Sequence, residues 1–213
     1  MKLGETIVVA TKNAGKVREF NHAFAQLGIR VVSMFDYPEL PDIVEDGDTF
    51  SANARKKART LAEALKMPVL ADDSGLEVER LNGEPGVYSA RYSGEDTNDA
   101  RNNAKLLSEL EWRMDEANLA ELDRLDDGSR LMSAARFVCV LALYNPGDAS
   151  FKEAEGFVSG AIIDRPRGEG GFGYDPLFWL PEHGRTMAEM TAAEKQAISH
   201  RGRALEKLLA QLK

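Results

Sequence analysis

The stretch IVVATKNAGK, residues 7–16, joins a short apolar run to a polar turn. Its first residues are mostly β-branched, which predicts a buried strand. Apolar residues then recur at helical spacing from Val17 to Leu27, and Gly28 follows as a helix stop. The stretch therefore predicts a strand, a turn and a helix in direct succession, as in α/β and mixed α+β folds.

The rest of the chain continues this mixture of strands and helices. Residues 135–144 are almost wholly apolar, which predicts a central strand covered on both faces. An apolar strand at 69–71 is expected to end at the turn Asp72-Asp73-Ser74-Gly75. We therefore expect an α/β fold with a mixed sheet and flanking helices. The other expected elements are a helix capped by Thr49 and ended by Pro68, strands at 76–78 and 151–163, a loop at 82–96, a helix opened by Asp96 or Thr97 that carries Ala100, Asn103, Leu107 and Leu110, a glycine-rich loop at 164–173, an apolar run at 177–180, a helix capped by Thr191, and a terminal helix through Leu205, Leu208, Leu209 and Leu212.

Length and charge limit the possible functions. A chain of 213 residues corresponds to one domain, or to two small lobes. Its net charge of −8 argues against a protein that binds duplex nucleic acid through a basic face. The single cysteine, Cys139, cannot form an internal disulfide. No apolar run has the length of a membrane span or of a signal-peptide core, so we expect a cytoplasmic enzyme or binding protein without a membrane partner.

Residues 111–134 differ from the rest of the chain. They are strongly acidic overall and carry only a short leucine stripe, at Leu119, Leu122 and Leu125. This pattern predicts a solvated helix and turn, which we interpret as a peripheral insertion.

The turn from Thr11 to Lys16 is a candidate phosphate site. A helix that begins directly after a strand presents backbone N–H groups and a positive dipole end, which suit a phosphate. Lys16 adds a charge, although the Walker A spacing is absent. A capped turn with a surface lysine explains the same residues, so both interpretations remain open.

Two acidic segments are candidate metal ligands. Asp72 and Asp73 follow an apolar run, and Glu45-Asp46-Gly47-Asp48 precedes the second helix. Carboxylates from separate segments can form a hard oxygen site for Mg²⁺, which keeps several waters and needs few protein ligands. The alternatives are a solvated acidic turn at 72–73 and ordinary N-terminal helix charge at 45–48.

Glycines surround two aromatic residues in GEGGFGYDP, residues 168–176. Stacking of a base on Phe172 or Tyr174 would contribute about 1–3 kcal/mol, whereas a tight loop whose aromatic rings fill the core is the simpler interpretation. Lys195 and Ser199-His200-Arg201 place several hydrogen-bond donors close together, with a solvated helix face as the alternative.

Taken in this order, the segments resemble the inosine triphosphate pyrophosphatase family from about residue 6 to residue 210. The combination of ADDSGL, GFGYDP and SHR is the specific part of the resemblance. The matching motifs are ATKNAGK (10–16), EDGDTF (45–50), NA (53–54), ADDSGL (71–76), PGVYSARYSG (85–94), GGFGYDPLF (170–178) and EKQAISHRGRAL (194–205).

The resemblance implies a fold and a reaction. The fold is an elongated mixed β-sheet with flanking helices, in two lobes around a central substrate cleft, usually assembled as a homodimer. The reaction is the Mg²⁺-dependent hydrolysis of ITP, dITP or XTP to the nucleoside monophosphate and pyrophosphate.

The resemblance also implies roles for individual residues. Asp73 would be the essential acidic residue, as a metal ligand and as the acceptor of the proton from the attacking water. Glu45 and Asp72 would support the metal. The implied substrate-binding residues are Thr11, Lys12, Asn13, Ala14, Gly15 and Lys16 at the triphosphate, Ser74, and Phe172, Gly173, Tyr174, Asp175, Lys195, His200 and Arg201 at the base.

Two positions depart from the family pattern. Lys12 stands where the family commonly has Gly, and Ala52 where it commonly has Glu, which gives Glu45 more weight as a metal ligand. The alternative functions are a pyrophosphatase for modified pyrimidine triphosphates and a non-catalytic nucleotide sensor.

Overall fold

The computed structural model describes residues 4–25, 27–40 and 43–212. The chain forms two compact units, and strands β3, β4 and β5 contribute residues to both. Unit 1 comprises Met1–Asp73, Cys139–Gly156 and Arg201–Lys213, and unit 2 comprises Ser74–Val138 and Phe157–His200.

The sheet is mixed, as the sequence predicts. Across the described ranges its strand order is β2-β1-β3-β4-β5-β6-β7. β1 runs parallel to β2 and β3, and β6 runs antiparallel to β5 and β7. No described helix is both long enough and apolar enough to cross a membrane. The strands are β1 (Thr6–Val9), β2 (Arg30–Ser33), β3 (Val69–Val78), β4 (Leu131–Asn145), β5 (Ser150–Ile163), β6 (Phe178–Leu180) and β7 (Arg185–Thr186); the helices are α1 (Ala14–Ala25), α2 (Phe50–Leu65), α3 (Asp99–Trp112), α4 (Glu116–Ala120), α5 (Ala192–Ile198) and α6 (His200–Ala210), with short 3₁₀ turns η1 (Met34–Asp36), η2 (Glu79–Leu81), η3 (Gly86–Arg91) and η4 (Met187–Glu189).

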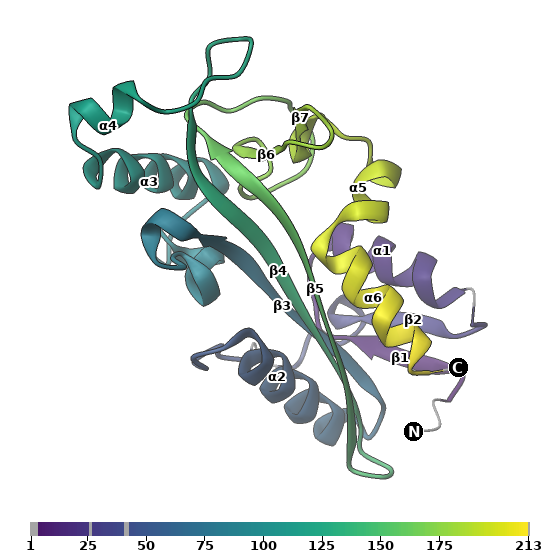
Figure 1. The fold of residues 1–213 in the computed structure, drawn as a ribbon. Coiled ribbons are helices and arrows are strands. Elements are labelled where there is room, and N and C mark those ends of the chain that lie inside the picture. Colours follow the sequence, from purple (N-terminus) through teal and green to yellow (C-terminus); the bar gives the residue numbers. More distant parts are fainter. Residues whose placement is uncertain (1–3, 26, 41–42, 213) are drawn as a thin grey trace. The chain divides into compact units, whose positions relative to one another are not determined.

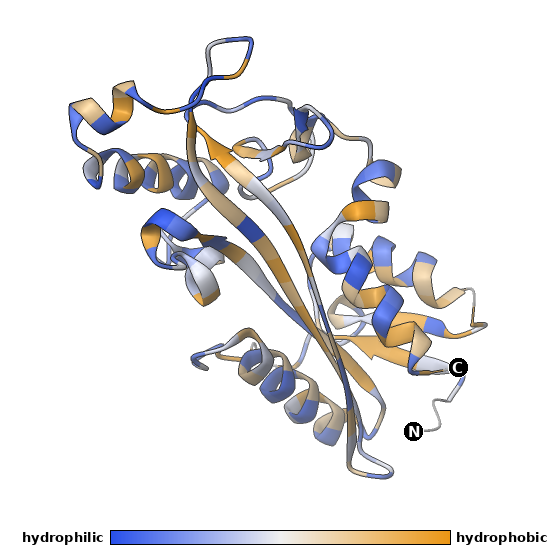
Figure 2. Cartoon of the chain, viewed as in Figure 1, coloured by the Kyte–Doolittle hydropathy of each residue, from blue (hydrophilic) through white to orange (hydrophobic). Residues whose placement is uncertain are grey.

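In unit 1, helices cover both faces of the strands. Ile7 and Val9 of β1 pack in one cluster with apolar residues of α1 and α6. The Tyr144 hydroxyl of β4 donates a 2.8 Å hydrogen bond to Glu63 of α2, which lies on the opposite side of the strands from α1 and α6 (Figure 1). Because both faces are covered, the consecutive residues Ile7, Val8 and Val9 of β1 are all buried, and Figure 2 shows this part of the strand as hydrophobic.

Helix boundaries in unit 1 follow the sequence signals. Thr49 caps α2, since its side chain accepts a hydrogen bond from the backbone N–H of Ala52. Gly28 lies in the left-handed region with φ +67° shortly after α1, a conformation that glycine adopts without steric cost. Both expectations are confirmed.

The expected turn at Asp72-Asp73-Ser74-Gly75 is wrong. These residues lie inside β3, which runs unbroken from Val69 to Val78 and joins the two short strands expected from the sequence. Polar residues seemed to end the first strand because they interrupt its apolar run. In the structure Asp72 and Asp73 are buried, and cationic and amide partners compensate the cost of burying them.

Unit 2 has its own core, formed by β3, β4, β5, β6 and α3. Helix α3 begins at Asp99 with Asn98 as its cap, one or two residues later than expected. Its buried residues are Asn102, Leu106 and Leu110. Of the expected stripe, Leu110 is buried, Leu107 is partly buried and packs against the core, Asn103 is partly buried and Ala100 is exposed.

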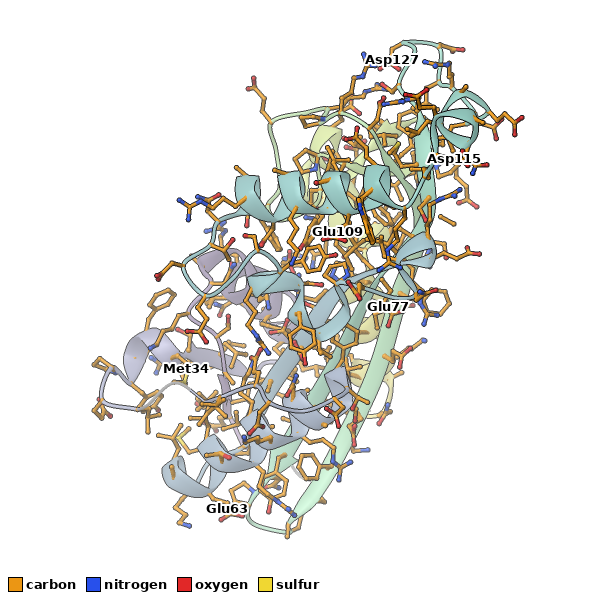
Figure 3. The ribbon with its side chains drawn as sticks, turned by 90° about the vertical axis from the view of Figure 1, so that its left-hand side faces the viewer. Met34, Glu63, Glu77, Glu109, Asp115 and Asp127 are labelled. Carbon is orange, nitrogen blue, oxygen red and sulfur yellow. The ribbon has the colours of Figure 1, made fainter. Side chains whose placement is uncertain are left out.

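The segment 111–134 is only partly separate from the regular structure. It begins in the last turn of α3 and ends inside β4, with α4 between them. Asp115 and Asp127 lie on the connection between α3 and β4 (Figure 3). Leu119 and Leu122 pack against the unit 2 core, and Asp127 pairs with Arg167 at 3.2 Å, so this connection is tied to unit 2.

Candidate functional site

The turn after β1 is capped by its own side chains. Asn13 Oδ1 accepts hydrogen bonds from the backbone N–H groups of Gly15, at 2.9 Å, and Lys16, at 3.1 Å. Thr11 Oγ1 accepts from the N–H of Asn13 at 3.1 Å. The amides expected to face a phosphate are therefore already paired in part, and the side chain of Lys16 is the clearest anion-binding group of this turn. Lys12, Asn13 and Ala14 are exposed.

Asp72 is the centre of a buried ionic cluster in unit 1. Lys16 Nζ lies 2.7 Å from Asp72 Oδ2, and Arg201 Nη2 lies 3.3 Å from the same oxygen. Arg201 Nη1 also contacts Glu19 at 3.3 Å. The side chains of Asp72 and Arg201 are each only 2% exposed, so little water competes with these contacts.

This cluster keeps Asp72 ionised. Burial alone would raise the pKa of its carboxyl, but the charges of Lys16, Arg201 and Lys57 outweigh burial and hold the pKa well below the ordinary value. A carboxylate that already balances several cations is a weaker candidate for a metal ligand. The geometry favours Asp73 and Glu45 over Asp72 for that role.

Asp73 points to the other face of β3. Side chains alternate along a strand, and Asp73 Oδ2 accepts a 2.9 Å hydrogen bond from Asn53 Nδ2 of α2. Burial raises the pKa of Asp73 to about 6, with the negative charge of Glu45 adding to the effect and the Asn53 bond opposing it. Asp73 is thus a carboxyl group that exchanges protons near neutral pH.

Two residues of α2 complete this part of unit 1. Asn53 Oδ1 accepts a 2.7 Å bond from the N–H of Gly47, so the same amide joins the loop before α2 to Asp73. Lys57 forms an ion pair with Glu45 and donates to the backbone carbonyl of Asp72 at 3.2 Å. Burial disfavours the charged form of Lys57, but Asp72 and Glu45 outweigh it and raise its pKa.

Neither Asn53 nor Lys57 was identified as functional from the sequence. The available signal was their spacing, because residues four apart on a helix share one face. The NA motif at 53–54 marked one of them without giving it a role. Only the position of Asp73 beside α2 shows why an amide is needed there.

The residues of unit 1 fit a hard cation in part. Among the residues described, no cluster of three or more His, Cys, Asp or Glu side chains could hold a metal ion. Asp73 and Glu45 do interact electrostatically, and Glu45 already attracts the ammonium group of Lys57. Mg²⁺ is commonly held by one or two carboxylates together with substrate phosphates, so this pair fits a metal that arrives with a nucleotide.

In unit 2, the glycine-rich loop forms an aromatic and ionic group. Asp175 accepts a 2.8 Å hydrogen bond from the N–H of Phe172 and forms an ion pair with Lys195. Lys195 Nζ lies 4.4 Å from the centre of the Phe172 ring, which is 43% exposed. A partly exposed ring can stack on a base. The cation and the carboxylate beside the ring can contact the polar edge of that base.

The second aromatic residue of the loop is structural. Tyr174 is buried and its hydroxyl donates a 2.8 Å hydrogen bond to the carbonyl of Ser89. Gly171 allows the close approach within the loop, since a Cβ there would collide with the side chain of Asp175. Of the two rings proposed for stacking, Phe172 is therefore the accessible one.

The remaining expected site residues also belong to unit 2. His200 is buried and its ring stacks on that of Phe137, with centroids 5.0 Å apart. Ser74 directly follows Asp73 in β3. Unit 1 thus holds the charged residues expected at a triphosphate, together with Arg201. Unit 2 holds Ser74, His200 and the loop expected to bind the base.

The chain is similar to proteins of known sequence and structure along almost its whole length. The Ham1 family model matches residues 7–211. A protein from Geobacillus kaustophilus named dITP/XTP pyrophosphatase is 53% identical over 95% of this chain and 91% of its own length. A protein of the same name from Geobacter sulfurreducens is 49% identical over 93% and 92%. A HAM1 protein structure from Coxiella burnetii superposes with a TM-score of 0.84 at 41% identity, covering 98% of both chains.

Proposed function

This chain belongs to the Ham1 family, and from that premise we propose that it hydrolyses non-canonical purine nucleoside triphosphates such as dITP, ITP and XTP. The products are the nucleoside monophosphate and pyrophosphate. Such an enzyme removes deaminated purines from the nucleotide pool of the cytoplasm, where we expect it to act.

The observation that carries the proposal is the chemistry of Asp73. Asp73 is a buried carboxyl oriented by Asn53, and burial raises its pKa above the ordinary value; a positioned carboxyl of this kind suits a general base. Asn53 donates a hydrogen bond to Asp73 Oδ2 and so orients the carboxylate.

We assign the steps of the reaction to this chain's own residues. The oxygen of a water molecule forms a bond to the α-phosphorus as its proton passes to the Asp73 carboxylate. The bond from the α-phosphorus to the bridging oxygen breaks, and pyrophosphate leaves with the electron pair. Lys16 neutralises charge on the triphosphate oxygens, supported by the turn from Thr11 to Gly15.

The proposed cofactor is Mg²⁺, held by Asp73 and Glu45. When bound, it would neutralise negative charge on the phosphate oxygens. Glu45 is available to a metal only if its ion pair with Lys57 loosens, which leaves Lys57 to contact phosphate or the backbone of Asp72. The metal assignment for Asp72, implied by the resemblance, is the weaker one, since Lys16 and Arg201 already compensate its charge.

Unit 2 is proposed to recognise the base. Phe172 stacks on its face, while Asp175, Lys195 and His200 contact its edge. Inosine and xanthine carry a carbonyl at C6 where adenine carries an amino group, so donors such as Lys195 favour them. Ser74 is proposed as a substrate contact, and Gly173 and Tyr174 as parts of the loop that present Phe172.

The test is turnover of dITP, XTP, dUTP and dATP, with the products identified as monophosphate and pyrophosphate. We expect dITP and XTP to be preferred, and activity to be lost in EDTA and restored by Mg²⁺. Preference for dUTP would indicate a pyrimidine enzyme, and tight binding without turnover would indicate a sensor.

Asp73→Asn provides the matched variant, because it changes one carboxylate to its isosteric amide. It should remain folded and lose nearly all turnover. Asp148→Asn, in the exposed turn between β4 and β5, makes the same chemical change away from the proposed site and should retain full activity. If Asp73→Asn kept more than about a tenth of the activity, Asp73 would not be the general base.

The proposed assembly is a homodimer, which the family resemblance implies. Sedimentation equilibrium measures it directly, and a mass of one chain at micromolar concentration would contradict it.

A further inference from the structure

Side chains from the first two turns of α3 bind one residue of the glycine-rich loop, Gly173. The backbone N–H of Gly173 donates a 2.7 Å hydrogen bond to Asp99 Oδ2, and the carbonyl of Gly173 accepts a 3.0 Å bond from Asn103 Nδ2. Asp99 and Asn103 are four residues apart, so they share one face of the helix. Both polar groups of a single peptide residue are thus bound by two side chains from one helix.

Gly173 has an unusual conformation that these bonds maintain. Its φ is +61°, which is accessible to glycine at little cost. A Cβ at this position would meet no atom within 4 Å, so glycine is needed here for its backbone freedom rather than for space. A residue with that freedom needs partners to keep one conformation, and Asp99 and Asn103 supply them.

The position of Gly173 matters because of its neighbours. Phe172 precedes it, and the N–H of Phe172 binds Asp175 just beyond it. Lys195 contacts both Phe172 and Asp175. A rotation of the backbone at Gly173 would therefore turn the exposed ring away from the carboxylate and the ammonium group.

We propose that Asp99 and Asn103 are positioning residues for base selection: by holding Gly173 from both sides, they fix the Phe172 ring relative to Asp175 and Lys195. The role rests on the proposed function, because it concerns how that activity discriminates between bases. Asp99 and Asn103 bind the backbone of Gly173, so both act through the backbone of the loop.

Asn103→Asp is the sharpest substitution. It keeps the size of the side chain but replaces the donor with a carboxylate oxygen, which repels the Gly173 carbonyl. Within the described chain, Asn103 Oδ1 is a buried atom without a hydrogen-bond partner, so the new carboxylate would gain no donor from that side. Asp99→Asn is the milder variant, since it keeps an acceptor oxygen for the Gly173 N–H.

The matched control is Asn98→Asp. It adds the same charge next to the same helix start, while Asp replaces Asn as an N-cap with little loss. Hydrogen exchange of the Gly173 amide reports directly on the two bonds that Asp99 and Asn103 make to Gly173, which we call the clamp, and does not depend on activity. The ratio of kcat/KM for dITP to that for dATP reports base selection, and the inhibition constant of inorganic tripolyphosphate reports the triphosphate site.

We expect faster exchange at Gly173 in Asn103→Asp and Asp99→Asn, a dITP to dATP ratio reduced about threefold to tenfold, and an unchanged inhibition constant for tripolyphosphate. Asn98→Asp should match the unmodified protein in all three. Unchanged exchange would overturn the clamp, and faster exchange with an unchanged ratio would overturn its role in selection. An unmodified protein that does not hydrolyse dITP would instead refute the proposed function, while the exchange data still decide whether the clamp exists.

Discussion

The carboxylates of Asp72 and Asp73, adjacent in β3, have opposite electrostatic surroundings. Asp72 faces Lys16 and Arg201, and Asp73 faces the amide of Asn53. The pKa of the first is held well below its ordinary value, whereas that of the second is raised to about 6. The alternation of a strand thus separates a permanently charged structural group from one that can accept a proton.

This separation predicts opposite effects of the same substitution on stability. Asp72→Asn leaves Lys16 and Arg201 without their shared carboxylate, and breaking a buried ion pair commonly costs about 3–5 kcal/mol. Its free energy of unfolding at pH 7, from urea titration, should fall by that amount. The adjacent Asp73→Asn is the control and should show no such loss; equal losses at the two positions would contradict the assignment.

The raised pKa of Asp73 predicts how its contribution to stability varies with pH. The folded protein keeps the Asp73 proton up to a pKa of about 6, whereas the unfolded chain releases it near the ordinary pKa of 3.8. Between these values the folded state binds more protons, so the contribution of Asp73 falls as pH rises through this window.

The measurement is the free energy of unfolding of the unmodified protein and of Asp73→Asn, both in EDTA, from pH 4 to pH 7.5. Asp73→Asn should be nearly equal in stability at the acidic end and more stable by up to about 3 kcal/mol at pH 7.5. The Asp72 cluster is present in both proteins and cancels in the difference. A difference that shrinks as pH rises would show that the pKa shift has the opposite sign.

Most of the fold could be predicted from the sequence, because covered strands and capped helices leave local signals. The apolar run at 135–144 and the cap at Thr49 needed no knowledge of distant residues. The path of β3 could not be predicted in this way. Its polar middle belongs to a strand because Lys16, Arg201 and Asn53, all far away in the sequence, compensate its carboxylates.

The site shows the same limit. The sequence motifs indicated Asp73, Lys16 and the loop at 172–175 as site residues, because these residues carry the proposed chemistry themselves. They gave no role to Asn53 or Asn103, whose importance lies in which backbone or carboxylate group they contact. Positioning residues have ordinary local patterns, and only the assembled structure identifies their partners.

Lys16 is predicted to act on substrate rather than mainly on stability. Lys16→Ala removes one cation from Asp72, but Arg201 still contacts the same oxygen, so the loss of stability should be smaller than for Asp72→Asn. A hydrogen bond to a charged group contributes about 1.5–3 kcal/mol, so kcat/KM for dITP should fall about tenfold to a hundredfold. Lys12→Ala removes the exposed lysine of the same turn and should have a weaker effect. If the two variants lose activity equally, bulk charge rather than Lys16 itself attracts the substrate.

Arg201 tests whether a hydrogen-bond donor in the motif at 194–205 recognises the base. The sequence resemblance implies that Arg201 recognises the base. The guanidinium group of Arg201, however, contacts Asp72 and Glu19 and is almost completely buried. An arginine held by two carboxylates has few donors left for a ligand. We therefore expect Arg201→Ala to lower the free energy of unfolding by about 3–5 kcal/mol, and to reduce kcat/KM for ITP and ATP in equal proportion. Lys195→Ala, in unit 2, should instead reduce the ITP to ATP ratio. The two ratios, measured on folded protein at 20 °C or below, separate the roles: a selective loss of ITP turnover in Arg201→Ala would show that Arg201 does recognise the base.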